Sequence, residues 1–240
     1  MTRFKSCFTV LATVPLLAPG LTAGAATLSI ENKTLRVQFD ESSASFSVAQ
    51  KASSSVFLKA GKLDGVAVGI RTGRTRDKVF GAGQSITVTH ADGSAASLEL
   101  FPDLPFLLVR GTVHNGGNAP IDLAKVVPAS FALDLGKPVA DLRTMGTAGL
   151  TPPGGHPGSY LFLTLAEPAT RRGVVAGWLT EDRGSGVCFS GVKEGAVEFK
   201  AQIDYGHLRL LPGSSAELET LAVGFFDDAR LGEELYAEQI

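Results

Sequence analysis

Two pairs of adjacent carboxylates are the residues in this chain whose types could support acid–base chemistry. Glu181 and Asp182 form one pair, and Asp227 and Asp228 form the other. Glycoside cleavage uses two carboxyl groups about 5–10 Å apart across the scissile bond. Neighbouring residues at a strand end point to opposite sides of the strand, so neither pair is placed to face a substrate. We interpret the first pair as part of a turn and the second as a helix start, and we expect no catalytic residue.

The histidines and cysteines indicate neither a metal site nor a nucleophile. The histidines lie far apart and none has another two or four positions away, as zinc ligands on one element would: they are His90, His114, His156 and His207. Cys188 lies in an apolar stretch and is expected to be a buried thiol rather than a nucleophile. The chain also lacks a G-x-S-x-G elbow, an H-E-x-x-H motif and a phosphate-binding loop. We expect no metal and no cofactor.

The connection 147–159 is the candidate for contact with a substrate or partner. It is long and contains three prolines, which make it stiffer than a glycine-serine linker. Long connections of this kind are commonly functional. We expect a shaped surface loop, with His156, Pro157 and Tyr160 near the substrate. Trp178 lies in an apolar run and is expected in the core rather than on an exposed sugar-binding platform.

Residues 1–26 have the pattern of a secretory signal peptide. Arg3 and Lys5 precede an apolar run, and Ala23 and Ala25 fit an A-x-A cleavage site. The run is interrupted by proline and is shorter than the roughly 20 residues that a membrane span needs, so no membrane anchor is expected. We expect the mature chain to be exported, to the periplasm or outside the cell.

The charge pattern argues against nucleic acid as a partner. The formal net charge is −2 at pH 7. The densest basic cluster is Arg71, Arg74, Arg76 and Lys78, and Gly73 and Asp77 interrupt it. A phosphate backbone requires a longer basic surface, so we interpret the cluster as a solvated turn between strands.

The rest of the chain has the alternation of short strands. Residues 27–226 contain repeated apolar-polar runs, such as Leu35, Val37 and Phe39, and the run Val66, Val68 and Ile70 is read in the same way; turn sequences separate them. The apolar run 106–109 predicts a strand covered on both faces, and Asp92-Gly93 predicts a tight hairpin turn. The connections are too short for parallel crossovers. We predict an all-β fold: a large, mostly antiparallel two-sheet β-sandwich in one domain, 27–226.

The pattern changes to that of a helix over residues 227–240. Asp227 is a suitable N-cap, and Asp228 suits the positive end of the helix dipole. One broad apolar face is predicted to contain Leu231, Leu235, Tyr236 and Ile240. A helix this short is marginal alone, so that face needs a partner.

Four segments of the chain resemble the amino-terminal β-supersandwich of α-galactosidases of glycoside hydrolase family 36 and its close relatives. These are 31–40 (ENKTLRVQFD), 98–106 (LELFPDLPF), 109–115 (VRGTVHN) and 157–160 (PGSY). They are strand and turn patterns in the right order, without a catalytic signature. The resemblance implies a retaining glycosidase in which a helix links the sandwich to a (β/α)8 barrel that holds both catalytic aspartates. No residue of this chain matches the barrel motifs.

Two functions follow from the resemblance. In the first, this is the non-catalytic domain of an exported α-galactosidase-like enzyme, and it supports and partly walls a catalytic barrel that is missing from this chain. Residues 227–240 would then start the linker to that barrel, and the loop 147–159 would lie near an α-galactoside substrate. In the second, the chain is a free-standing periplasmic carbohydrate-binding or interaction module. The first predicts that Leu231, Leu235 and Tyr236 lack a well-packed partner here; the second predicts that they dock on the sandwich. A complete small enzyme is the third and least favoured reading.

Overall fold

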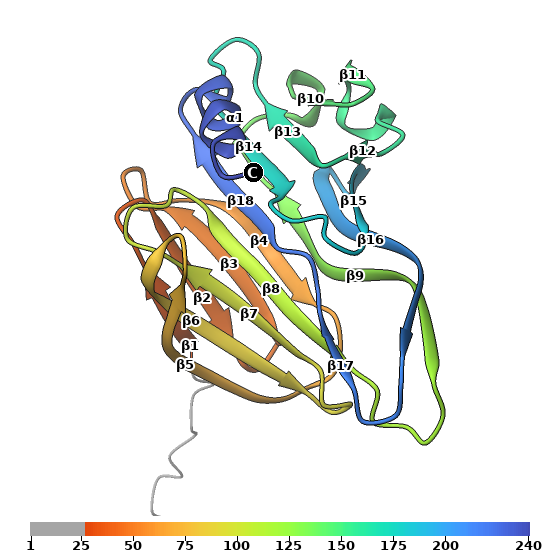
Figure 1. The fold of residues 1–240 in the computed structure, drawn as a ribbon. Helices are drawn as coiled ribbons and strands as arrows, with labels where there is room; N and C mark the ends of the chain where they lie inside the picture. The colour runs from red at the N-terminus through yellow and green to blue at the C-terminus, as the bar shows by residue number, and fades with distance from the viewer. Residues whose placement is uncertain (1–26) are drawn as a thin grey trace, which may run out of the picture.

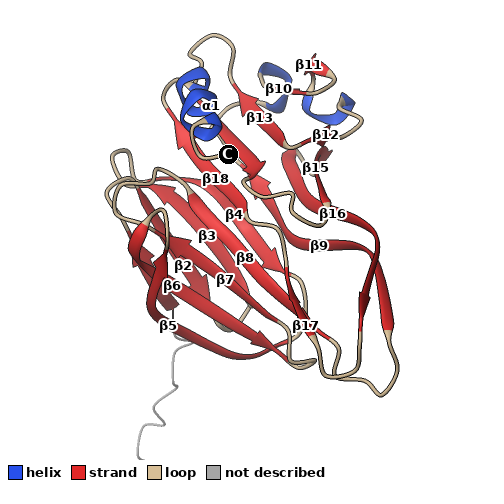
Figure 2. Ribbon diagram, viewed as in Figure 1, coloured by secondary structure: helices blue, strands red, loops and turns tan. Residues whose placement is uncertain are grey.

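A computed structural model describes residues 27–240, which fold as two β-sheets packed face to face (Figure 1). Strands dominate this part of the chain, and the helical segments gather at one end (Figure 2). Every pairing between strands is antiparallel. The predicted all-β, antiparallel two-sheet sandwich is therefore confirmed. The predicted signal peptide, residues 1–26, lies outside the described residues.

The first sheet has eight strands in the order β1-β2-β3-β4-β9-β16-β15-β12. In chain order their bounds are β1 Thr27–Glu31, β2 Leu35–Asp40, β3 Ser45–Gln50, β4 Ser55–Leu63, β9 Ile121–Leu133, β12 Ser159–Tyr160, β15 Ser185–Lys193 and β16 Ala196–Leu210. The long strands β9 and β16 pair with each other and extend the sheet beyond its neighbours (Figure 1).

The second sheet has ten strands in the order β11-β10-β13-β14-β18-β8-β7-β6-β5, with β17 also paired to β8. Their bounds are β5 Ala67–Asp77, β6 Gly81–His90, β7 Ala95–Leu100, β8 Leu107–His114, β10 Arg143–Gly146, β11 Gly149–Thr151, β13 Phe162–Ala166, β14 Gly173–Trp178, β17 Ser215–Glu217 and β18 Leu221–Phe226. Two 3₁₀ turns, Val139–Asp141 and Pro153–Gly155, and the helix α1, Ala229–Ala237, complete the fold.

Alternation along the strands builds the core between the sheets. In β2, Leu35, Val37 and Phe39 are buried, whereas Arg36 and Gln38 between them are exposed. Successive side chains of a strand point to opposite faces, so every second residue enters the core. The predicted apolar face of this strand is therefore confirmed.

Strand β8 is buried on both faces at its start, as its continuous apolar run predicts. Leu107 and Val109 join the core between the sheets. Phe106 and Leu108 belong to a second apolar cluster on the outer face of the second sheet, which Tyr236 of α1 covers. This small outer core is what fixes the helix to the sandwich.

Two turn and strand predictions have opposite outcomes. The Asp92-Gly93 hairpin is confirmed: it joins β6 to β7, and Gly93 has the positive φ of 85° that such turns favour. The core face predicted from Val66, Val68 and Ile70 is wrong for the two valines, whereas Ile70 packs against the core. Val66 and Val68 are 73% and 65% exposed, because β5 is the edge strand and its register with β6 shifts where it begins.

The connection 147–159 is more regular than predicted. We expected no strand in it, but residues Gly149–Thr151 form β11, which pairs with β10. A glycine with φ of 81° at position 149 closes this tight hairpin. The loop is therefore a short hairpin followed by a 3₁₀ turn, and it returns to the first sheet through β12.

Helix α1 begins one residue later than predicted. Asp228, rather than Asp227, is the N-cap, and its side chain accepts a hydrogen bond from the backbone N–H of Arg230 at 3.2 Å. Arg171 also forms an ion pair with Asp228 at 3.2 Å. The cap and this ion pair fix the start of the helix to the turn before β14.

The buried face of α1 differs from the predicted one. Ala229, Gly232 and Tyr236 are buried, whereas Leu231 and Leu235 are 56% and 37% exposed. The helix lies very close to the sheet: a Cβ added at Gly232 would come within 2.4 Å of the Phe226 ring. The helix therefore buries its small residues and one tyrosine and leaves its leucines in solvent.

Candidate functional site

A polar cleft opens on the outer face of the second sheet, over strands β5–β8. Its volume is about 380 Å³. The residues lining it come from β5–β8, β17 and the segment before β18: Arg74, Thr75, Ser85, Thr87, Ala95, Ala96, Ser97, Glu99, Arg110, Gly111, Thr112, Glu217, Leu218 and Thr220. Most of these side chains carry hydroxyl or charged groups. We call this region the polar cleft.

Strand register brings the central residues of the polar cleft together. Ser85 of β6 is opposite Glu99 of β7, and Thr87 is opposite Ser97. Ser97 is in turn opposite Arg110 of β8. Directly opposed residues share a face in an antiparallel pair, so these side chains lie on one surface. The same alternation that buries Leu98 between the sheets therefore places a row of polar groups on the outer face, where Ser85 and Glu99 are themselves buried.

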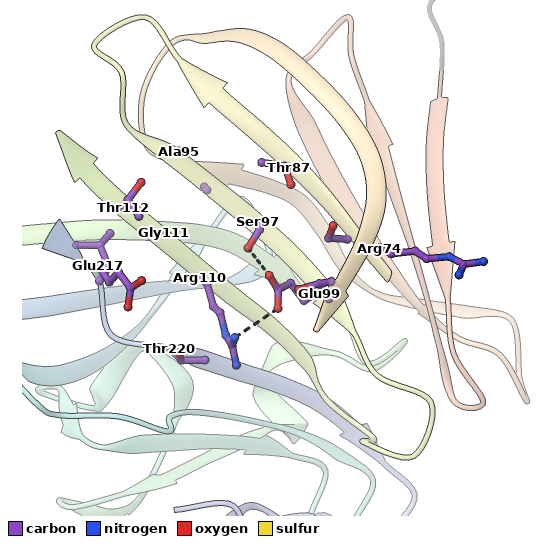
Figure 3. Close-up of a pocket in the computed structure, with 14 residues that line it drawn as sticks. Arg74, Thr87, Ala95, Ser97, Glu99, Arg110, Gly111, Thr112, Glu217 and Thr220 are labelled. Carbon is purple, nitrogen blue, oxygen red and sulfur yellow. Dashed lines mark hydrogen bonds and ion pairs between the residues drawn. The ribbon is translucent and has the colours of Figure 1, made fainter. Parts of the chain in front are cut away.

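Arg110 lies between two carboxylates. Its Nη2 atom is 2.6 Å from Oδ2 of Asp77, and its Nη1 atom is 3.6 Å from Oε2 of Glu99. The hydroxyl of Ser97 donates a hydrogen bond to Oε1 of Glu99 at 2.9 Å, as Figure 3 shows. Arg74 points away from this group in the same view. The arrangement holds one guanidinium against two acids and a hydroxyl.

Asp77 is held in its ionised form. Burial opposes the charged carboxylate, but hydrogen bonds from Arg110 and from the backbone N–H groups of Phe80 and Val79 outweigh it and keep the pKa of Asp77 below its ordinary value. The carboxylate therefore keeps the end of β5 attached to β8. It supports the polar cleft rather than lining it.

Two polar atoms at the centre of the polar cleft have no hydrogen-bond partner. They are Oε2 of Glu99 and Nε of Arg110, and both are buried. Glu99 as a whole is only 7% exposed. Both atoms are closed off from solvent, and the nearest charged partner of Oε2 is Nη1 of Arg110 at 3.6 Å.

The polar cleft is chemically suited to binding. No histidine lines it, and the two acids that do are Glu99, which faces Arg110, and Glu217. Among residues 27–240, no group of three or more His, Cys, Asp or Glu side chains is arranged to hold a metal ion.

The predicted substrate residues lie elsewhere in the fold. His156 is buried, its Nδ1 atom accepts a hydrogen bond from the backbone N–H of Gly158 at 3.2 Å, and burial lowers the pKa of its ring. Pro157 is exposed, and Tyr160 is 61% exposed. None of these three lines the polar cleft. Their proximity to a substrate remains a prediction.

The residues of the polar cleft were not identified from the sequence. A signal was present: Ser97 and Glu99 occupy alternate positions of one strand, and Arg110 occupies a matching position of the next. Charged residues at outward positions are usually solvated, however, and pairing them requires the register between β7 and β8. The turn joining these strands does not fix that register.

A second surface feature lies at the end of the sandwich that carries α1. A groove of about 130 Å³ separates the helix from the β10–β11 hairpin. It is lined by Arg143, Met145, Leu150, Thr164, Ala166, Pro168, Arg171, Ala229, Arg230 and Glu233. We define the apolar end as the groove residues Met145 and Leu150 together with Leu231 and Leu235 of the helix, which are 38%, 65%, 56% and 37% exposed.

The apolar residues of the helix differ in whether they pack against this domain. Tyr236 docks on the sandwich, where its hydroxyl donates hydrogen bonds to the carbonyl oxygens of Trp178 at 2.6 Å and Leu161 at 3.3 Å. Leu231 and Leu235 lack such packing. One side of α1 is thus packed against this domain, and another apolar side is exposed to solvent. In the described part of the chain, no helix has the length and hydropathy that crossing a membrane requires.

Comparisons with known proteins identify the fold. No family model matches the chain, and no curated protein matches it in sequence. A galactose mutarotase related enzyme from Lactobacillus acidophilus matches with a TM-score of 0.59 at 12% identity, over 84% of this chain and 97% of that one. A putative aldose 1-epimerase from Escherichia coli K12 matches with a TM-score of 0.54 at 9% identity, over 85% of this chain and 100% of that one.

An enzyme with a much longer chain contains the same fold. A glycoside hydrolase family 97 enzyme from Pseudoalteromonas sp. strain K8, solved with panose, matches with a TM-score of 0.58 at 11% identity. The match covers 84% of this chain but only 36% of that one, so this chain spans about a third of the length of that enzyme. At such low identity the likeness establishes the sandwich fold alone, and it does not single out glycoside hydrolase family 36.

Proposed function

We propose that this chain is a non-catalytic β-sandwich domain of an exported, α-galactosidase-like glycoside hydrolase, and that it supports and partly walls a (β/α)8 catalytic barrel. The fold is shared with carbohydrate-active enzymes, one of which is far longer than this chain. The four segments that resemble the family 36 supersandwich favour the α-galactosidase type.

The observation that carries this proposal is the apolar end. Met145 and Leu150 line a groove with α1, and Leu231 and Leu235 are exposed on the same helix. Each such side chain gains about 1.5–3 kcal/mol when it is fully buried. Large apolar side chains exposed at one end of a domain are typical of a protein interface. The occupant we propose is the catalytic barrel.

The predicted substrate loop is placed at this same end. The hairpin β10–β11 begins the connection 147–159, and the exposed Pro157 and Tyr160 end it. A barrel bound at the apolar end would therefore meet the loop, and an α-galactoside held by the barrel would lie near it. His156 would then act from inside the loop, where it maintains the turn through Gly158.

The alternative is a free-standing periplasmic carbohydrate-binding or interaction module. The docking of Tyr236 favours it, because the helix is already held by this domain. In that case the apolar end would need no partner from another domain.

Co-expression of this chain with the glycosidase barrel encoded nearest to it in its genome distinguishes the two proposed functions. We expect the chain and the barrel to co-purify. Changing both Leu231 and Leu235 to Glu should abolish this co-purification. The control Val66→Glu, at another exposed apolar position, should leave it intact. The chain alone should not hydrolyse aryl α-galactosides. Co-purification that survives the double change, or no association at all, would contradict the proposal and favour the free-standing module.

A further inference from the structure

We propose that the open edge of β5 is a docking site for an extended acidic segment of another protein, which adds to the second sheet as a further strand. In strand order, β5 and the β10–β11 hairpin are at opposite margins of that sheet, so this site is separate from the apolar end (Figure 1). The inference goes beyond the proposed function, because it gives the domain a second partner and does not depend on the catalytic barrel.

The length of β5 distinguishes it from the strands at the other margins of the two sheets. The terminal strands β1, β11 and β12 have 5, 3 and 2 residues, whereas β5 has 11. Proteins commonly keep edge strands short, because an unpaired strand is a template for pairing with another chain. At about twice the usual strand length of about 5–6 residues, β5 offers an added strand far more backbone than the other three margins do.

The backbone of β5 is open along this margin. The register pairs Ala67–Asp77 with β6 on one side of the strand. Within residues 27–240, no backbone group outside that pairing forms a hydrogen bond with residues 67–77. Alternate residues of an antiparallel strand direct their N–H and C=O groups to opposite sides, so every second residue of β5 presents a donor and an acceptor to a further strand.

A hollow beside the first half of β5 leaves room for the side chains of an added strand. Its volume is about 450 Å³, and it is lined by residues 65–70 and by Glu41 and Ala44 of the turn between β2 and β3. Val66 and Val68, which line it, are 73% and 65% exposed. We therefore expect apolar residues of the segment to lie against these two valines.

The second half of β5 indicates that the segment is acidic. Arg71, Arg74 and Arg76 are exposed, and none of them forms an ion pair within residues 27–240. They were expected in a solvated turn, but all three belong to the strand itself. Asp77, the only acid of β5, is already held by Arg110. Carboxylates on an added strand would pair with the three arginines across the ladder.

The arginines are directed away from the polar cleft or along the strand surface rather than into a shared site of this domain. Arg74 and Arg76 occupy alternate positions and so share one face of β5, and Figure 3 shows Arg74 pointing away from the polar cleft. Arg71 is on the opposite face of the strand. The added strand can therefore place acidic side chains on both of its faces.

The same charges argue against a second copy of this chain as the occupant. Two antiparallel β5 strands related by a two-fold axis would bring the three arginines of each copy into one short ladder. Like charges on adjacent strands destabilise the pairing. A phosphate backbone would be attracted by the arginines, but it lacks the N–H groups with which an edge strand pairs.

The test is amide hydrogen exchange of this chain with a synthetic peptide of alternating glutamate and valine that has the 11-residue length of β5. We expect slower exchange across β5 and unchanged exchange in α1 and β10–β11. A peptide with lysine in place of every glutamate should give no protection. A glutamate peptide with N-methyl groups on its central residues keeps every charge but loses backbone donors, and it should also give no protection.

Charge reversal on β5 supplies the matched variants, with affinity measured by the fluorescence anisotropy of the labelled glutamate peptide. Arg74→Glu should weaken binding at least tenfold, which corresponds to about 1.4 kcal/mol, because an attraction becomes a repulsion. Arg209→Glu, at an exposed position of the other sheet, is the control and should bind as the unchanged chain does. Arg71→Glu gives a second measurement if Arg74→Glu fails to fold.

Several outcomes would overturn the proposal. They are a lack of protection of β5 by the glutamate peptide, equal protection by the lysine or the N-methylated peptide, and normal binding by both Arg74→Glu and Arg71→Glu. Protection of β5 that grows with protein concentration alone would identify a second copy as the occupant, and equal protection by oligodeoxythymidylate would identify nucleic acid. Changing Leu231 and Leu235 should leave peptide binding intact, so failure here is distinguishable from failure of the barrel proposal.

Discussion

The attachment of α1 to the sandwich depends on the phenol of Tyr236. Its ring is 3% exposed and lies among Phe106 and Phe162, with ring centroids 6.4 and 6.1 Å away. Its hydroxyl donates to the carbonyl oxygens of Trp178 and Leu161. Burial raises the pKa of this phenol, so it remains a hydrogen-bond donor at neutral pH. Two substitutions separate the contribution of the hydroxyl from that of the ring.

Tyr236→Phe removes the hydroxyl alone and should lower the free energy of unfolding by about 1 kcal/mol, the usual net value of one hydrogen bond. Tyr236→Ala also removes the ring and should cost about 3–5 kcal/mol, the range found when a buried aromatic side chain is truncated. The larger change empties the centre of the outer core, so we expect it to release α1 from the sheet.

Urea unfolding followed by the fluorescence of Trp178, the only tryptophan of the chain, measures both costs. The indole is fully buried, and the backbone carbonyl oxygen of the same residue accepts the hydrogen bond from Tyr236, so the probe lies at the affected site. Tyr160→Phe is the control, because Tyr160 is 61% exposed and its stability change should stay within about 0.5 kcal/mol. If Tyr236→Phe behaves like this control, or Tyr236→Ala costs less than about 1 kcal/mol, the reasoning on the outer core is refuted.

Three further predictions follow from the contacts of the domain. Gly177→Ala should lower the thermal unfolding midpoint, because the new Cβ would come within 2.5 Å of the Tyr236 ring; Gly191→Ala, with nothing within 4 Å, should not, and equal midpoints would refute the close approach. Because the pKa of Asp77 is lowered in the fold from its ordinary value of 3.8, its stabilising effect is present above that value and is lost as pH falls through the folded pKa. The urea midpoint of Asp77→Asn should therefore lie below that of the unchanged chain at pH 7, and the gap should close on acidification; a constant gap would contradict this. Cys188 is fully buried and burial raises the pKa of its thiol, so in protein lacking residues 1–26 it should react with a disulfide reagent only after denaturation, and rapid reaction of the native protein would show the burial to be wrong.

Local patterns were sufficient to predict the sheets. Alternation in β2 and the continuous apolar run at the start of β8 each reflect how many faces of a strand are covered, which the sequence records directly. The positive φ at Gly93 likewise reflects a local requirement of the turn. Val66 and Val68 were misread because an edge strand can expose apolar residues, and the register shift there has no sequence signature.

The helix face and the polar cleft could not be predicted because both depend on distant packing. Large apolar residues suggested that Leu231 and Leu235 face the sheet, but the glycines at 177 and 232 bring the helix too close for leucines and select the side with Ala229 and Tyr236. The polar cleft needs Glu99 and Arg110 from adjacent strands and Asp77 from the edge of the sheet. Residues so far apart in sequence are brought together only by strand order.

Hydrogen exchange on this chain, with and without the glycosidase barrel encoded nearest to it, tests the central claim most directly. The claim is that the apolar end binds a catalytic barrel. We predict slower exchange in β10–β11 and in α1 when the barrel is present, with unchanged exchange in β7 and β8 around the polar cleft. Unchanged exchange at the apolar end at saturating barrel concentration, or protection confined to other surfaces of residues 27–240, would contradict the claim.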